Sequence, residues 1–212
     1  MRQALTASSP HLHCGFRRAG SIAALVLIVA AAPVLAADPA AQIGTFDNAL
    51  IDAMKAGKAQ PLTARVAKLQ PVVRVTHDMA AMAALVVGPA WTATPAADRT
   101  ALIEAFARHS SIAYAENFAN FGGEKFMLDP KVETRGSDRL VRTTIVAPGS
   151  RTALNYRMRE SGGGWKIVDI YADGISQVAT QRAEFAATIK ASGVGGLAKR
   201  LNALDDAKLK RR

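Results

Sequence analysis

The sequence predicts an α+β protein in which helices from both ends of the chain cover an antiparallel sheet of about four strands. Apolar residues recur at helical spacing from residue 43 to residue 121 and again from 176 to 204. Between these regions, residues 131–171 alternate with a period of two and are rich in Val, Ile, Thr and aromatic side chains, which is typical of strands. Short turns at 148–149 and 161–164 join the last strands, and turns this short connect antiparallel neighbours.

Six helical segments are expected. In chain order they cover residues 43–55, 62–73, 79–87, 95–121, 176–190 and 194–204. Pro61 suits the first turn of the second segment, and Pro71 is expected to kink or break it. The third segment is apolar nearly all round but too short to span a bilayer, so it is predicted to be a buried core helix. The glycine-rich residues 193–196 follow a helix rather than a strand, which favours a helix stop over a phosphate loop.

Four strands are expected, at residues 131–135, 139–146, 152–159 and 165–171. In the third strand Leu154, Tyr156 and Met158 alternate with polar residues, so the sheet should have one apolar face and one solvated face. Two interpretations remain open for the basic residues of this region. Arg157, Arg159 and Lys166 either meet the phosphate of a ligand or simply occupy the solvated face.

The N-terminal residues have the three parts of a secretory signal peptide. Arg17 and Arg18 precede a short apolar run, and small residues up to Ala36 suit cleavage before Ala37. The apolar run is too short for a comfortable membrane span and ends at Pro33. We therefore expect residues 1–36 to be a signal peptide and residues 37–212 to form one domain outside the cytoplasm. The alternative is an uncleaved N-terminal anchor.

Cleavage would change the composition of the working protein. It would remove the single cysteine, so no disulfide or thiolate chemistry is expected. It would also reduce the 27 basic residues to 24 against 17 acidic ones, a net charge of +7. This surplus suits anionic lipid headgroups or acidic partners, or is simply a solvated basic surface. Nucleic acid is disfavoured by the export signal and by the lack of interleaved aromatic and basic residues.

A search for catalytic and metal-binding patterns is mostly negative. His77 and His109 are the histidines of residues 37–212, and neither stands in a metal-ligand motif. No serine lies in a G-x-S-x-G nucleophile elbow. Asp169 and Asp173 are spaced as an acid and base could be, but a strand-end turn with a helix-capping Asp explains them more simply. We expect no metal, no cofactor and no catalysis.

The run W-x-I-x-D-I-x-x-D-G-x-S, from Trp165 to Ser176, resembles the MlaC family of lipid-binding proteins, also called the toluene-tolerance auxiliary family. Residues 75–79, 88–91 and 193–197 also match the family pattern, so the resemblance covers nearly all of residues 37–212. It looks closest to the HpnM branch, which is associated with hopanoid-producing bacteria. The family implies a periplasmic carrier that encloses acyl chains and passes lipid between an outer-membrane complex and an inner-membrane ABC transporter. The Pro-Ala-Trp after Gly88 departs from the usual pattern and affects the expected local shape of the pocket.

Read with this resemblance, the apolar interior supplies candidate lipid-binding residues. They are Met79, Met82, Leu85, Val86, Phe106, Leu154, Tyr156, Met158, Ile170, Ile175, Val178, Phe185 and Ile189. The same residues would also make an ordinary filled core, and only the resemblance turns them into a pocket for phospholipid or hopanoid. The alternative is an NTF2-like enzyme or binding module with an interior carboxylate, such as Asp169 with His109 or Tyr114.

Overall fold

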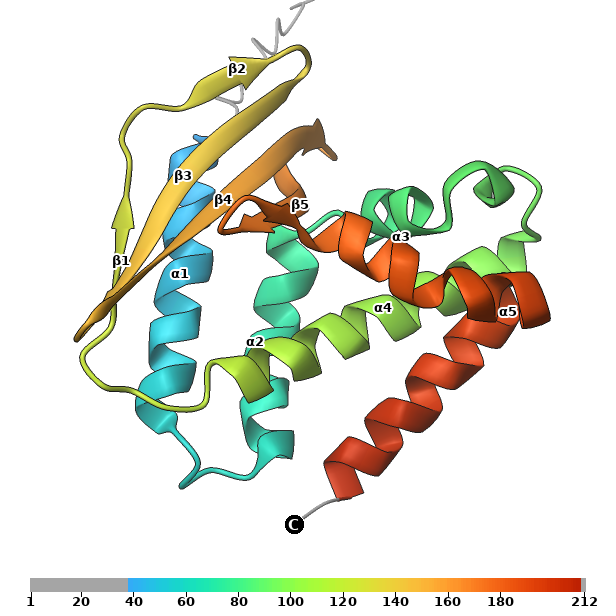
Figure 1. The fold of residues 1–212 in the computed structure, drawn as a ribbon, viewed down its shortest axis with the longest axis horizontal. Coiled ribbons are helices and arrows are strands. Elements are labelled where there is room, and N and C mark those ends of the chain that lie inside the picture. The colour runs from blue at the N-terminus through green and yellow to red at the C-terminus, as the bar shows by residue number, and fades with distance from the viewer. Residues whose placement is uncertain (1–37, 211–212) are drawn as a thin grey trace, which may run out of the picture. The chain divides into compact units, whose positions relative to one another are not determined.

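The computed structural model describes residues 38–210, which fold around one antiparallel sheet (Figure 1). The predicted signal peptide, residues 1–36, lies outside the described residues. Four helices and a 3₁₀ turn precede the sheet: α1 (Pro39–Ala56), α2 (Leu62–Thr76), α3 (Met79–Val87), η1 (Gly88–Trp91) and α4 (Ala96–Asn117). A long helix, α5 (Gln177–Lys210), follows the sheet. Within residues 38–210, no helix is long and apolar enough to cross a membrane.

The predicted α+β class is confirmed, but the sheet has six strands instead of about four. They are β1 (Lys125–Leu128), β2 (Glu133–Arg135), β3 (Asp138–Ala147), β4 (Ser150–Ser161), β5 (Gly164–Ala172) and β6 (Ile175–Ser176). The order is β1-β3-β4-β5-β6, with β2 beside the other end of β3. The sequence analysis missed β1 and β6 because four and two residues are too few to show a period of two.

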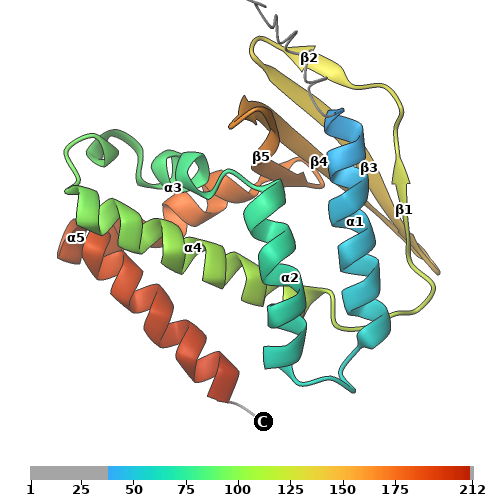
Figure 2. The same ribbon diagram turned by 180° about the vertical axis from the view of Figure 1, so that it is seen from behind.

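Helices cover one face of the sheet, as Figures 1 and 2 show from opposite sides. Tyr156 and Met158 on β4 are buried beneath the helices, whereas Arg157 between them lies on the opposite face. Strand β5 carries a bulge, since Arg157 is opposite Asp169 while Met158 is opposite Ile167. The bulge places Ile167 and Ile170 on the same inner face although they are three residues apart.

Helix α2 differs from the expectation, whereas helix α5 agrees with it. Helix α2 continues through Pro71, where a kink or break was expected. The carbonyl of Ala67, which loses its hydrogen bond to the proline, belongs to an exposed residue and can be solvated. Helix α5 is two helices joined at Gly193, whose φ of 69° and ψ of −176° are not helical. The predicted stop at this glycine is therefore confirmed.

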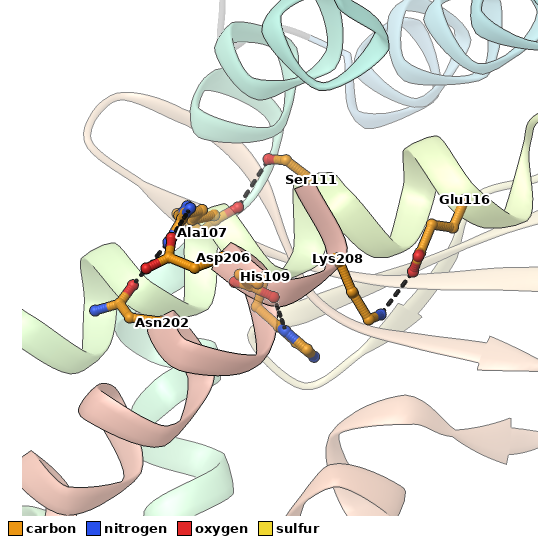
Figure 3. Close-up of polar contacts among 9 residues, drawn as sticks. Ala107, His109, Ser111, Glu116, Asn202, Asp206 and Lys208 are labelled. Carbon is orange, nitrogen blue, oxygen red and sulfur yellow. Dashed lines mark hydrogen bonds and ion pairs between the residues drawn. The ribbon is translucent and has the colours of Figure 1, made fainter. Parts of the chain in front are cut away.

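Polar side chains hold the C-terminal half of α5 against α4 (Figure 3). Arg108 of α4 forms an ion pair with Asp206 at 2.6 Å, and Lys208 pairs with Glu116 at 2.6 Å. His109 lies 2.8 Å from the fully buried Asp205. Apolar residues of the same half, including Leu197 and Leu201, are buried in the core. This half of α5 is therefore anchored on α4 and not on the sheet.

The break in α5 gives a test of the fold. Gly193→Ala should lower the free energy of unfolding by about 1–3 kcal/mol, because this backbone region is open almost only to glycine. A Cβ atom at position 193 meets nothing within 4 Å, so the cost is one of backbone conformation. Gly44→Ala is the control, since Gly44 is helical with equally open space and alanine should stabilise it by about 0.5–1 kcal/mol. Urea unfolding measures the change in free energy of unfolding for both variants. If the two substitutions changed it equally, the non-helical backbone angles at Gly193 would be wrong.

Candidate functional site

A cavity of about 270 Å³ lies between the inner face of the sheet and the covering helices. Helices α1, α3, α4 and α5 and strands β3, β4 and β5 all contribute to its wall. The apolar and aromatic lining residues are Phe46, Leu50, Met82, Ala113, Tyr114, Phe118, Ile145, Leu154, Tyr156, Ile170 and Ala172. Polar lining comes from Ser110, Asn117, Thr152, Gln177 and Gln181. The site is thus a mainly apolar chamber with a few polar groups.

The structure places four of the thirteen predicted lipid-binding residues on the cavity wall: Met82, Leu154, Tyr156 and Ile170. Six others are buried in the surrounding core, namely Met79, Val86, Phe106, Met158, Val178 and Phe185. Leu85 and Ile189 are partly buried and pack against that core. These eight residues therefore pack as ordinary core side chains, which was the alternative interpretation of the apolar pattern.

The position of Ile175 corrects one expectation, and the positions of Arg157 and Arg159 decide between two interpretations that the sequence left open. Ile175 is 63% exposed because β6 is a two-residue strand at the edge of the sheet, so its side chain does not belong to an interior wall. Arg157 and Arg159 bind the carboxylate of Asp138 on the outer face, with a closest distance of 2.5 Å for Arg157. These ion pairs hold the pKa of Asp138 below its ordinary value. The two arginines therefore occupy the solvated face, away from the cavity.

A buried carboxyl group lies next to the cavity wall. Asp47 on α1 is 4% exposed and is not among the lining residues. Its Oδ1 accepts a hydrogen bond from the hydroxyl of Tyr156 at 2.9 Å. Burial raises the pKa of Asp47 to about 7, and the hydrogen bond from Tyr156 opposes part of that rise. Burial, followed by the charge of Asp47, also raises the pKa of Tyr156 well above its ordinary value.

A second buried pair links α2 to α4. Nε2 of His77 lies 2.9 Å from the hydroxyl of Tyr114, and Nδ1 lies 2.9 Å from the hydroxyl of Thr76. The Thr76 hydroxyl donates to the carbonyl of Val72, so it accepts from Nδ1–H, and Nε2 then accepts from Tyr114. Burial lowers the pKa of His77 to about 3, so the imidazole is neutral at neutral pH.

The acid proposed for an enzyme site has a structural role. Asp169 accepts hydrogen bonds from the backbone N–H of Val178 at 3.1 Å and from the hydroxyl of Ser176 at 2.6 Å. It thereby fixes the start of α5, which agrees with the capping interpretation. His109 pairs with Asp205 and Tyr114 with His77, so the suggested combinations with Asp169 do not form.

Sequence reasoning missed several residues of the site. Phe46 and Leu50 belong to the apolar stripe that predicted α1, and that stripe was the signal that could have placed them in the wall. Asp47 stands beside Phe46, but a single acid in a helix gives no sign of burial. The sequence also gives no sign of the role of Gln181, because a glutamine at this position of a helix is expected to be on the surface. In the structure its Oε1 is buried and has no hydrogen-bond partner in residues 38–210.

Helices over one face of an antiparallel sheet, with an apolar chamber between them, define the class of small α+β binding proteins with an interior pocket. A family model described as MlaC protein matches residues 45–203, and the chain therefore belongs to the MlaC family. The resemblance inferred from the Trp165–Ser176 run is thus confirmed at the level of the family.

A solved structure shows the same fold. It is the phospholipid-binding protein from Ralstonia solanacearum, solved in complex with a phospholipid. The match has a TM-score of 0.70 and 24% sequence identity, and it covers 82% of this chain and 100% of the other. This likeness establishes a common architecture for the helices and the sheet.

The buried Asp47 predicts a dependence of stability on pH. Because its pKa is raised from 3.8 to about 7, the folded protein keeps a proton over a range in which the unfolded chain has lost it. The wild type should therefore lose stability relative to Asp47→Asn as the pH rises from about 4 to about 7, by roughly 4 kcal/mol in total. Urea unfolding at several pH values measures this difference.

Asp52→Asn is the matched control, because Asp52 lies on the same helix but is exposed. It should leave the difference from wild type nearly constant across the same range. If the free energy of unfolding changed with pH in the same way for wild type and Asp47→Asn, this result would contradict the burial of an ionisable carboxyl group beside Tyr156.

Proposed function

We propose that this protein is a periplasmic lipid carrier that shields acyl chains in the cavity beneath the sheet. The observation that carries the proposal is the apolar chamber lined by Phe46, Leu154 and Tyr156 in a chain of the MlaC family. The phospholipid bound by the Ralstonia solanacearum protein of the same fold supports phospholipid as the cargo. The chain moves this cargo between the outer and inner membranes.

The energy of the tails explains why a carrier needs such a chamber. A two-chain lipid has roughly 30 methylenes, and their exposure costs on the order of 24 kcal/mol at about 0.8 kcal/mol each. A water-soluble protein can carry the molecule only if it covers most of that surface. Release then requires a partner that opens the chamber or offers a competing apolar site.

The size of the cavity bears on how cargo enters. At about 270 Å³ it is slightly smaller than typical ligand pockets, which span about 300–1,000 Å³. Two acyl chains therefore require the wall to move outward. Met82 is a flexible part of that wall and can adapt to chains of different shape. The N-terminal half of α5 contributes Gln177 and Gln181 to the wall, but Asp169 holds its start and Val178 and Phe185 are buried in the core, so outward movement of this half has to break those contacts.

Polar groups of the wall suit the polar part of a lipid. Gln181 has a buried Oε1 with no partner in residues 38–210, and Gln177 and Asn117 also line the cavity. A lipid hydroxyl or headgroup amine can satisfy such an acceptor, which otherwise costs free energy. We assign these residues to the glycerol or headgroup end of the cargo and the aromatic wall to its tails.

A hopanoid is the second cargo considered, in keeping with the HpnM-like pattern of the sequence. A rigid polycyclic molecule cannot adapt to a narrow chamber as flexible chains can, so it requires a larger displacement of the wall. Phospholipid is therefore the better supported cargo. The proposed partners are those of the family, an inner-membrane lipid transporter and an outer-membrane lipid complex.

One observation favours an enzyme or small-molecule binding module instead. Asp47 and Tyr156 form an interior acid pair of the kind that such a site needs, and the pKa of Asp47 is about 7. However, Asp47 does not line the cavity, and its hydrogen bond to Tyr156 already uses the hydroxyl that a substrate would meet. The carrier remains the better explanation of the site.

Filling the chamber tests the carrier proposal. Ala113→Trp places an indole in the cavity from α4 and should remove most co-purified lipid, because the tails lose the space they occupy. Native mass spectrometry of the purified protein, followed by organic extraction and lipid analysis, measures the bound amount and identifies phospholipid or hopanoid.

Ala101→Trp is the matched control, since Ala101 is an exposed residue of the same helix. It should retain lipid at the wild-type ratio. Stoichiometric lipid on Ala113→Trp, in protein with wild-type circular dichroism, would refute the cavity as the binding site. Lipid-free wild type that turns over small carbonyl compounds would favour the enzyme.

A further inference from the structure

A second hollow, of about 420 Å³, lies between α1 and α2. It shares no lining residue with the cavity beneath the sheet. Small residues of α1, Ala49, Ala53 and Ala56, line one side. Arg65 and Lys68 line the other side from α2, and Figure 2 shows the two helices next to each other.

Arg65 is buried there without a counter-charge. It is 7% exposed, and neither Nε nor Nη1 has a hydrogen-bond partner within residues 38–210. An arginine cannot escape this cost by losing its proton, and an unpaired buried charge is strongly unfavourable. Two other buried ionisable groups in the described part of the chain differ from Arg65 because they have ionisable partners. The carboxylate of Asp138 pairs with two arginines, and that of Asp205 pairs with His109. Arg65 therefore brings to the wall of the groove a positive charge that has no counter-ion among the described residues, and an anion in the groove would compensate it.

The surroundings indicate which kind of anion fits. Lys68 supplies a second positive charge, and Asp52 is the one acid that lines the groove, so the lining carries a net charge of +1. Asp52 is exposed, and the Nε and Nη1 atoms of Arg65 do not bond to it. A guanidinium beside an ammonium suits the oxygen atoms of a phosphate. The apolar floor formed by Leu69, Val72 and the alanines suits the carbon atoms next to such a group.

The turn after α1 adds further features of a membrane contact. Lys55 and Lys58 are exposed near the end of α1 and in the following turn. Lys55 lies 5.7 Å from the centre of the Phe121 ring, which is 44% exposed. Exposed basic side chains beside an aromatic ring are typical of surfaces that meet anionic lipid headgroups.

We propose that the α1–α2 groove binds the phosphate of an anionic lipid headgroup at a membrane surface, with Arg65 as the main ligand and Lys68 as the second. The site is separate from the chamber for the tails, and its occupation does not depend on cargo being bound there. It attaches the protein to the bilayer, where lipid is collected or delivered.

Arg65→Met tests this assignment, with Arg151→Met as the matched control. Both remove one positive charge, but Arg151 is exposed on β4 and lies outside the groove. The probes are vesicles of phosphatidylcholine alone and vesicles of phosphatidylcholine with phosphatidylglycerol, in a co-sedimentation assay. Arg65→Met should weaken binding to the anionic vesicles about tenfold. Arg151→Met should stay within about twofold of wild type, because an exposed charge outside the site is screened by salt.

Stability separates a binding role from a structural one. Because Arg65 has no partner to lose, Arg65→Met should unfold at the same urea concentration as wild type or at a higher one. A clear loss of stability together with weaker binding would show a structural ion pair and overturn the proposal. Equal vesicle binding by wild type and both variants, or equal losses in both variants, would also overturn it.

Two further arms identify the source of the phosphate and separate this site from the chamber. If inorganic phosphate raises the melting temperature of wild type but not of Arg65→Met, while all proteins bind vesicles equally, the groove is a free-phosphate site and the headgroup assignment is wrong. Ala113→Trp should bind anionic vesicles as wild type does, since its substitution lies in the other cavity. Loss of vesicle binding in Ala113→Trp would show that tails in the chamber, and not the groove, hold the bilayer.

Discussion

The contacts of the Phe46 ring hold together the elements that surround the cavity. The ring is fully buried and lies edge-on to His77, Tyr114 and Tyr156, with centroid distances of 4.9, 5.1 and 6.2 Å. These partners belong to the end of α2, to α4 and to β4, so one side chain of α1 fixes the spacing between three neighbours. Edge-on aromatic pairs are each worth about 0.5–1.5 kcal/mol beyond the area they bury. The hydrogen bonds of Asp47 with Tyr156 and of His77 with Tyr114 surround this ring and limit how the aromatic groups can turn.

An interior left partly unfilled has an energetic consequence. The site has Ser110, Asn117 and Gln181 in its wall, so it is not a purely apolar void and has room for water beside its polar groups. A lipid tail that enters replaces water against the aromatic wall, and burial of that apolar surface contributes to its affinity. The aromatic cluster around Phe46 holds one wall of the chamber in place, and the flexible side chain of Met82 lets another part of the wall adapt to a guest.

The sequence predicted the elements whose patterns are long and the face of the sheet that is buried. The alternation of Leu154, Tyr156 and Met158 identified the inner face, and Gly193 identified the break in the last helix. The sequence could not distinguish residues of the cavity wall from residues of the filled core. Met82 and Met79 are equally apolar, but Met82 faces the cavity whereas Met79 packs against other core side chains. Buried polar residues were missed for a related reason. Asp47, Arg65 and Gln181 all have the sequence pattern of surface residues in a helix. The structure nevertheless buries the side chains of Asp47 and Arg65 and the Oε1 atom of Gln181 against other segments of the chain.

Helix α1 is the common wall of both hollows, and this position has a consequence for the proposed site at Arg65. Phe46 and Leu50 face the chamber beneath the sheet, whereas Ala49 and Ala53 face the groove beside α2. The aromatic contacts of Phe46 hold α1 in place, so the alanine side of the groove keeps its distance from Arg65 whether or not the chamber is filled. By linkage, a guest in the chamber changes headgroup affinity only if it shifts the groove between two arrangements that bind the headgroup differently. A fixed α1 therefore keeps the two sites independent, and the protein holds a membrane equally well in either loading state.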